Sequence, residues 1–286
     1  MRPEASPEYG SDGRYNPAGE SCRNGSSRLA ASAGGACPGV ANQKGGVCKT
    51  TTVVNLAAAL AEIGKRILVV DLDGQCNATT WLGVQPGRGI LDLFEGAVDN
   101  VDEIVVASRI EGVSTVPATP GLANLDRALA SEPGGEQILK LGLKRTGAAW
   151  DLVLIDCPPA LGLATVNALT ASHLVLVSCE TSSLALDGLN ALLETVDKVR
   201  LRMNPTLKLL GILPNKVDLR MRVARDVIVT LRERFNEAVL GSSIRHSVRF
   251  LEAPAHRKPI TEYDRHGRGG EDFRALADEI AARIRP

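Results

Sequence analysis

The feature that most constrains the fold of this chain is a glycine-rich segment that leads directly into a helical pattern. Residues 42–51 read Asn-Gln-Lys-Gly-Gly-Val-Cys-Lys-Thr-Thr. A turn of this kind before a helix directs backbone N–H groups and the positive helix end toward a phosphate. In this interpretation Lys49 neutralises the phosphates and the Thr50 hydroxyl binds Mg²⁺. Taken alone, the segment could also be a tight turn before a threonine-rich helix start.

Short aliphatic runs alternate with amphipathic helical patterns along the rest of the chain. The runs lie at 66–70, 152–155, 174–177 and 207–213, and helical spacing is clear at 53–63 and 186–199. Near-continuous aliphatic strands separated by helices are typical of a parallel sheet covered on both faces. We therefore expect an α/β fold with a doubly wound, mostly parallel sheet. A C-terminal helix should bury the side formed by Phe273, Leu276, Ile280 and Ile284.

Aspartates follow two of the predicted strands. Asp71 and Asp73 end the first, and Asp156 ends the second, just before two prolines. In α/β sheets, ligands bind at the carboxyl ends of strands. Each aspartate alone could be a helix cap or a surface residue. Together with the glycine-rich loop, however, they predict a P-loop NTPase with nucleotide and Mg²⁺ at this edge.

Composition and charge limit the other possibilities. The 286 residues contain 33 basic and 33 acidic side chains, so the net charge is zero, and no apolar run reaches the length of a membrane span. Without a signal-peptide pattern, a cytoplasmic location is expected. The six cysteines show no metal-ligand spacing and are expected to be reduced thiols. Residues 1–39, rich in Gly, Ser and Pro, are expected to form a disordered extension before a single domain at 40–286, although a folded partner-binding arm is possible.

Three stretches carry a specific family resemblance. They are ANQKGGVCKTTTVVNLAAALA with VVDLDGQCNATT, DLVLIDCPPALGLATVNALTAS, and EAPAHRKPITEYD. Together they resemble the ParA/Soj family of plasmid and chromosome partitioning ATPases over nearly everything from residue 40 onward. The resemblance implies a deviant Walker A loop, a Mg²⁺–ATP sandwich homodimer that acts as a switch, and slow hydrolysis stimulated by a ParB-like centromere-binding protein.

The resemblance also implies roles for individual residues. Lys44 would reach across the dimer to the partner's phosphates, and Lys49 would act in the same protomer. Asp73 would orient the attacking water and join the Mg²⁺ shell, while Asp156 would hold Mg²⁺ through water. Asn215 would lie near the adenine. The predicted nucleotide contacts are Gly45, Gly46, Val47, Cys48, Lys49, Thr50, Thr51 and Asn215.

The chain departs from the family pattern in its nucleotide half. Cys48 stands where phosphate loops carry glycine, and if that position needs a positive φ, the cysteine adds roughly 1–2 kcal/mol of strain. Gly74 and Cys76 stand where the family has Pro and Gly. Gly74 should loosen the turn after Asp73, and Cys76 should strain it. Residues 34–41, with three glycines and a proline, predict a short or irregular first strand. A nucleotide-impaired, non-catalytic protein is therefore an alternative, and a redox role for Cys48, with a lowered thiol pKa, is another.

The C-terminal third is locally basic. Residues 220–268 contain eleven basic and six acidic side chains. This excess predicts contact with the phosphate backbone of duplex DNA without sequence readout, although a solvated face with internal ion pairs would also explain it. The family resemblance points to Arg220 and Arg249 first and Arg245 second, on a nucleoid-associated protein. A MinD-like membrane protein is the remaining rival, which the lack of a basic, bulky apolar tail argues against.

Overall fold

The structure, a computed structural model, describes residues 38–41, 48–85, 87–146, 150–182 and 185–284. The predicted extension at 1–39 lies outside these residues as far as position 37. The first strand, β1 (Pro38–Ala41), begins two residues before the predicted start of the domain at residue 40. The lysine, glycine and valine of the predicted phosphate loop at 44–47 also lie outside the described residues.

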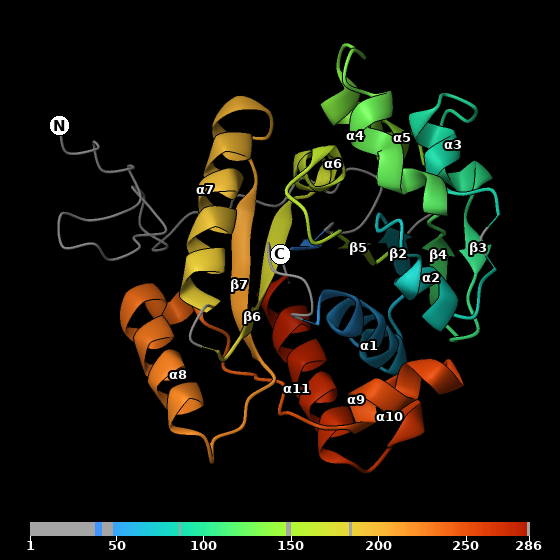
Figure 1. Ribbon diagram of the computed structural model, residues 1–286. Coiled ribbons are helices and arrows are strands. Elements are labelled where there is room, and N and C mark those ends of the chain that lie inside the picture. Colours follow the sequence, from blue (N-terminus) through green and yellow to red (C-terminus); the bar gives the residue numbers. More distant parts are fainter. Residues whose placement is uncertain (1–37, 42–47, 86, 147–149, 183–184, 285–286) are drawn as a thin grey trace, which may run out of the picture.

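A seven-stranded sheet forms the centre of the molecule (Figure 1). Its strand order is β3-β4-β2-β5-β1-β6-β7, and all neighbours are parallel except β3 and β4 at one edge. The remaining strands are β2 (Ile67–Asp71), β3 (Val106–Ala107), β4 (Val113–Val116), β5 (Leu152–Asp156), β6 (Leu174–Glu180) and β7 (Lys208–Asn215). All four strands predicted from aliphatic runs are present, and the doubly wound, mostly parallel α/β fold is confirmed.

Helices cover both faces of the sheet. In chain order they are α1 (Lys49–Glu62), α2 (Asn77–Trp81), α3 (Ile90–Phe94), α4 (Leu125–Ala128), α5 (Ile138–Lys144), α6 (Leu163–Ala171), α7 (Ala185–Arg202), α8 (Arg222–Phe235), α9 (Arg249–Glu252), α10 (Ile260–Tyr263) and α11 (Arg268–Arg283). In Figure 1, α1 and α11 lie together on one side of the sheet, and α6 and α7 lie on the other. None of the described helices is long and apolar enough to cross a membrane.

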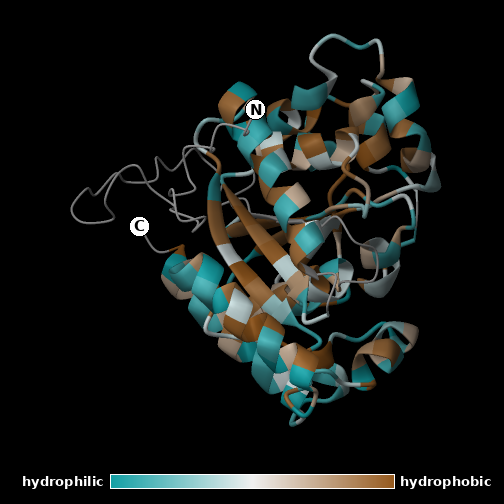
Figure 2. Cartoon of the chain, turned by 60° about the vertical axis from the view of Figure 1, so that its left-hand side comes forward, coloured by the Kyte–Doolittle hydropathy of each residue, from teal (hydrophilic) through white to brown (hydrophobic). Residues whose placement is uncertain are grey.

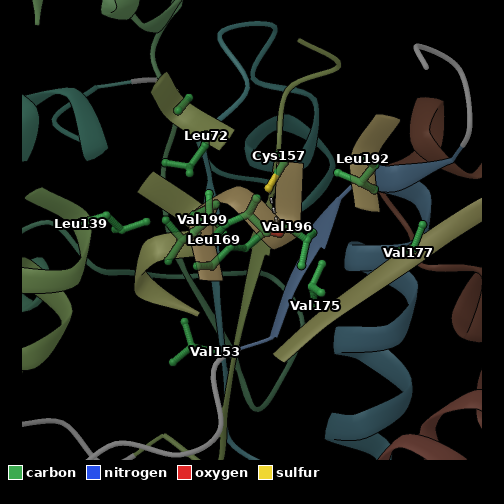
Figure 3. Packing of buried hydrophobic residues seen from close by; sticks show 14 of the residues in the cluster. Leu72, Leu139, Val153, Cys157, Leu169, Val175, Val177, Leu192, Val196 and Val199 are labelled. Carbon is green, nitrogen blue, oxygen red and sulfur yellow. Dashed lines mark hydrogen bonds between the residues drawn. The ribbon is translucent and has the colours of Figure 1, made fainter. Parts of the chain in front are cut away.

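Alternate side chains of β2, β5 and β6 contribute to two separate hydrophobic cores. On β2, Leu68 and Val70 join the core beneath α5, α6 and α7, part of which Figure 3 shows, whereas Ile67 and Val69 join the core beneath α1 and α11. This is the period of two expected for a strand buried on both faces. Accordingly, the strands are brown in Figure 2 and the outer helix faces are largely teal.

The first strand and the last helix behave as the sequence predicts. β1 has only four residues, begins with the proline that cannot donate to the ladder, and pairs with β5 and β6 at the centre of the sheet. On α11, Phe273, Leu276 and Ile280 are fully buried, and Ile284, just beyond the helix, is half-buried. The C-terminal helix therefore packs within the fold, against α1.

Candidate nucleotide-binding site

A hollow of about 950 Å³ opens at the carboxyl edge of the sheet. It is lined by the start of α1 (Cys48 to Thr51), by Asp73, by the ends of β6 and β7 at Glu180 and Asn215, and by side chains from the 216–223 and 245–251 segments. The structure therefore brings together the described members of the predicted nucleotide site. It also places the segments that carry Arg220 and Arg249 at the rim of the same hollow.

Lys49 lies at the base of this hollow as the first residue of α1. Only 7% of it is exposed. Burial lowers the pKa of its ammonium, while the charges of Asp156 and Asp73 oppose that shift. A cation held in this way at a helix N-terminus, where the backbone already favours anions, is suited to bind a phosphate.

Asp156 is the most poorly satisfied charged group in the described part of the chain. The residue is fully buried at the end of β5, and neither carboxylate oxygen has a hydrogen-bond donor in proper geometry among the described residues. Burial, followed by the charge of neighbouring Asp71, raises its pKa well above the usual value, while the Thr50 hydroxyl and Lys49 act against that rise. A buried carboxylate without donors needs a cation or a proton.

Asp71, the neighbour of Asp156 in the sheet register, has a different function. Its carboxylate accepts hydrogen bonds from the backbone N–H and the hydroxyl of Thr79, at 2.9 and 2.7 Å, and from the N–H of Asp73 at 3.1 Å. Burial raises the pKa of Asp71 to about 6, against the effect of these bonds. Asp71 therefore fixes the turn between β2 and α2 and does not face the hollow.

That turn presents Asp73 to the hollow. The carboxylate of Asp73 accepts a hydrogen bond from the N–H of Gln75 at 3.0 Å, and its carbonyl accepts one from Cys76 at 2.8 Å. Gly74 does more than loosen the turn, because a Cβ atom there would lie 2.8 Å from the backbone nitrogen of Ala123. Close backbone packing thus requires glycine at this position, which the sequence alone did not indicate.

Both cysteines that replace family glycines adopt the left-handed conformation. Cys48 has φ 63° and Cys76 has φ 55°, and they cap the N-termini of α1 and α2. The positive φ on which the sequence-based expectation of strain at Cys48 depended is therefore present, and a left-handed non-glycine residue of this kind generally costs roughly 1–2 kcal/mol. The expectation of a lowered thiol pKa is wrong, since burial raises the pKa of Cys48 more than Lys216 and Lys49 lower it.

Comparisons with known proteins place this site in a family. A family model described as an AAA domain matches residues 38–209. The sporulation initiation inhibitor protein Soj of Bacillus subtilis is 42% identical over 85% of this chain and 97% of its own length. The chromosome-partitioning ATPase Soj of Thermus thermophilus is 42% identical over 86% of this chain and 95% of its own. The chain belongs to the Soj/ParA family of partitioning ATPases.

Solved structures show the same fold. A Mycobacterium smegmatis protein described as cobyrinic acid a,c-diamide synthase, with bound ATP analogue and magnesium, is 36% identical and has a TM-score of 0.76 over 85% of this chain and 93% of that one. The MinD protein of Pyrococcus horikoshii, complexed with Mg-ADP, shares the fold, with a TM-score of 0.65 at 21% identity over 86% of this chain and 95% of its own.

Asn215 lines the hollow of this Soj/ParA-family chain, but its side chain is already engaged. The amide nitrogen donates to the hydroxyls of Thr52, at 3.2 Å, and Ser178, at 3.0 Å, while its oxygen accepts from the N–H of Lys216. Asn215 thus ties the ends of β6 and β7 to α1. Its predicted position near an adenine remains a prediction.

The three arginines predicted to bind DNA are all paired with carboxylates. Arg220 makes a two-pronged contact with Asp218, at 2.7 and 2.8 Å, and Arg249 donates to Glu252 at 2.8 Å. Arg245 contacts Asp272, which is only 9% exposed, as well as Glu271. The internal ion pairs considered as an alternative are therefore present. Of the three arginines, Arg245 has the most deeply buried partner, Asp272.

Two buried side chains that the sequence analysis missed connect the nucleotide site to the C-terminal segment. Asn55, in the second turn of α1, donates to the carbonyl of Thr51 and accepts a 2.6 Å hydrogen bond from the N–H of Ile260. Trp81, at the end of α2, donates to the carbonyl of Lys258 at 2.8 Å. These pairs are 205 and 177 residues apart, so no local pattern could have revealed them.

Proposed function

We propose that this chain is a Mg²⁺–ATP-dependent switch that forms an ATP-sandwich homodimer, hydrolyses ATP, and binds nonspecific duplex DNA and a ParB-like centromere-binding partner to segregate plasmid or chromosomal DNA. The observation that carries the nucleotide part is Asp156. Its carboxylate oxygens are buried without donors next to Lys49 and Thr50. Such a group fits a hydrated divalent cation, whose waters supply the donors that the described protein lacks.

The described residues fit the group that the family implies. Thr50 and Asp73 both line the hollow, and the buried carboxylate of Asp156 is close enough to Thr50 and Lys49 to influence them electrostatically. Oxygen ligands for Mg²⁺ and a cation for the phosphates are thus available near the start of α1. Bound Mg²⁺ would neutralise phosphate charge. The chain's own residues would hold the nucleotide in position, since phosphoryl transfer depends on placement and charge neutralisation.

Calorimetry with a slowly hydrolysed ATP analogue tests this assignment. We expect binding by the wild type in the presence of Mg²⁺, weaker binding in excess EDTA, and loss of the Mg²⁺ dependence in Asp156→Asn. Asp278→Asn, which changes an exposed carboxylate on α11, is the control. Equal binding by wild type and Asp156→Asn, with and without Mg²⁺, would overturn the assignment.

Dimerisation and DNA binding require separate tests. Light scattering should show a dimer with the ATP analogue and Mg²⁺ that Lys44→Ala weakens, because this lysine is proposed to contact the partner's phosphates. Two unrelated duplexes should bind with similar affinity, and that affinity should fall steeply between about 50 and 300 mM salt. Affinity for one duplex only, or no salt dependence, would contradict contact with the DNA backbone.

The impaired alternative is favoured by one observation, the left-handed cysteine at the start of α1. Strain of roughly 1–2 kcal/mol at this position is already present in the ligand-free fold and lowers its stability. A Cβ atom where phosphate loops carry glycine would also crowd a bound phosphate, and that crowding would weaken nucleotide binding by about tenfold without abolishing it. We therefore propose an active ATPase with reduced nucleotide affinity. A protein that binds DNA but shows no hydrolysis, even with the stimulating partner, would support the non-catalytic alternative.

A further inference from the structure

Glu252 forms an ion pair with Arg249, one of the two arginines ranked first for DNA binding in the sequence analysis. Arg249 Nη1 donates to Glu252 Oε2 at 2.8 Å, and the hydroxyl of Tyr263 donates to the same oxygen at 2.9 Å. Both ionic partners are exposed, with side-chain exposures of 52% and 42%. The ion pair therefore lies on the surface that a duplex would reach, and it occupies Arg249 before any phosphate arrives.

Tyr263 holds Glu252 in this position. Arg249 and Glu252 are the first and last residues of the one-turn helix α9, while Tyr263 belongs to α10. The ring of Tyr263 also stacks on His256, with ring centroids 5.1 Å apart. The hydrogen bonds from Arg249 and Tyr263 lower the pKa of Glu252, so the carboxylate is ionised at neutral pH.

We propose that Glu252, positioned by Tyr263, competes with DNA phosphate for Arg249 and so limits the affinity of this chain for DNA. Carboxylate and phosphate are alternative acceptors for the same planar donors. Glu252 accepts from Nη1 of Arg249, so a phosphate that engages both ends of the guanidinium must displace this carboxylate, and one that uses the other donors binds beside a like charge. This inference rests on the proposed DNA binding and adds a residue that opposes it.

Among the paired arginines, Arg249 offers the clearest test of such competition. Asp218, the partner of Arg220, lines the nucleotide hollow, so replacing it could also change nucleotide binding. The main partner of Arg245 is the nearly buried Asp272, which also accepts the backbone N–H of Arg245, so this pair supports the fold. Glu252 does not line the hollow, and its removal leaves no buried charge unpaired.

The experiment measures the affinity of the full-length protein for a fluorescent duplex, with Mg²⁺ and the ATP analogue present. We expect Glu252→Gln to tighten binding about two- to fivefold, the range that a surface ion pair supports. Tyr263→Phe should produce a smaller increase in the same direction without changing the charge. Glu262→Gln, which removes an exposed carboxylate on α10 paired with Lys258, is the charge-matched control.

A double-variant comparison separates competition for Arg249 from general repulsion. If Glu252 acts through Arg249, the gain from Glu252→Gln disappears in the Arg249→Ala background. A gain that persists there, or one that Glu262→Gln equals, would overturn the inference. If Arg249→Ala alone binds DNA as well as the wild type, the assignment of Arg249 to DNA is the part that fails. If Arg249→Ala weakens binding but Glu252→Gln changes nothing, only the competition is refuted. Thermal melting verifies that each variant is folded.

Discussion

The nucleotide site and the basic C-terminal surface satisfy their charged groups in opposite ways. At the carboxyl edge of the sheet, Asp156 is buried without a hydrogen-bond donor in proper geometry among the described residues, and Cys48 adopts a left-handed backbone conformation. On the basic surface, Arg220 and Arg249 are exposed and already paired. In the first region a bound ligand can supply the interactions that the buried carboxylate lacks. In the second region the arginines must give up existing ion pairs in order to bind a ligand.

This difference predicts where substitutions should stabilise the protein. A buried charge or a strained residue that is stabilised only by a bound ligand destabilises the ligand-free fold, so replacing it should raise the free energy of unfolding. Replacing an exposed, solvated ion pair should change the stability very little. Functional strain is therefore expected to be measurable at the nucleotide site and absent from the basic surface.

The largest expected effect is on stability in Asp156→Asn. Burial raises the pKa of Asp156 above that of the unfolded chain, so its protonated form stabilises the fold below about pH 4, and this stability is lost as the pH rises through the folded-state pKa. Asparagine carries no such charge. The substitution also removes the main opposite charge near the buried ammonium of Lys49, which offsets part of this relief. In metal-free buffer we expect a net gain of about 1–2 kcal/mol at neutral pH.

Urea unfolding at about pH 5, 6.5 and 8 in EDTA measures this gain, which should increase with pH. Asp278→Asn provides a control on an exposed face. A variant that is less stable than the wild type at every pH would show that Asp156 is satisfied in the ligand-free fold, which would remove the contrast between the two regions.

A smaller effect is expected from Cys48→Gly. Glycine adopts a positive φ without the cost that a side chain incurs, which stabilises the ligand-free fold. It also removes the Cβ atom that would crowd a bound phosphate, so the variant should bind the ATP analogue about tenfold more tightly, which corresponds to about 1.4 kcal/mol. Its stability should rise by less, about 0.5–1 kcal/mol, because glycine also increases the freedom of the unfolded chain. Calorimetry and urea unfolding measure the two quantities.

Cys76→Gly is the matched comparison. Cys76 has the same left-handed conformation but is only 5% exposed and belongs to the core beneath α5, α6 and α7. The loss of buried sulfur should offset the relief of strain, leaving the stability nearly unchanged. If both variants tightened nucleotide binding equally, crowding of the phosphate by the Cys48 side chain would not be the cause.

Arg245→Ala should lower the stability by about 1 kcal/mol, a figure already reduced for the solvent screening of a side chain that is 40% exposed. Its loss leaves the nearly buried Asp272 with a weaker set of partners. Urea unfolding tests this, with Arg66→Ala, which removes an exposed pair to Asp151, as the control. If both substitutions lowered the free energy of unfolding equally, the Arg245–Asp272 pair would contribute no more to stability than an exposed surface ion pair.

Much of the fold could be predicted because its signals are local. The aliphatic runs that became β2, β5, β6 and β7 are buried on both faces, and Gly64, with φ 81°, ends α1 where the pattern indicated. β4 was missed because its four residues include Ser114 and Thr115, which do not form an aliphatic run. Thr115 is buried only because of its place in the sheet, next to β2.

The candidate site divides in the same way. Lys49 and Asp73 could be predicted because a loop–helix motif and a strand end place them. The different functions of Asp71 and Asp156 could not be predicted. Thr79 donates its backbone N–H and its hydroxyl to Asp71 and not to Asp156, and this pairing depends on the folded turn. The pairing of Arg249 with Glu252 was within reach, since residues three apart on a helix are neighbours. The pairing of Arg245 with Asp272 depends on tertiary packing.

The smallest expected effect on stability belongs to Arg220→Ala. The arginine is fully exposed, and although its hydrogen bonds lower the pKa of Asp218 to about 2, water screens both charges, so the melting temperature should not change measurably. Affinity for duplex DNA should still fall, and the slope of log affinity against log salt should decrease by about one as one phosphate contact is lost. Anisotropy titrations at several salt concentrations measure this slope, with Arg66→Ala as the charge-matched control. A large loss of stability together with an unchanged salt slope would show that Arg220 serves the fold, and the basic surface would then resemble the nucleotide site more than its exposure suggests.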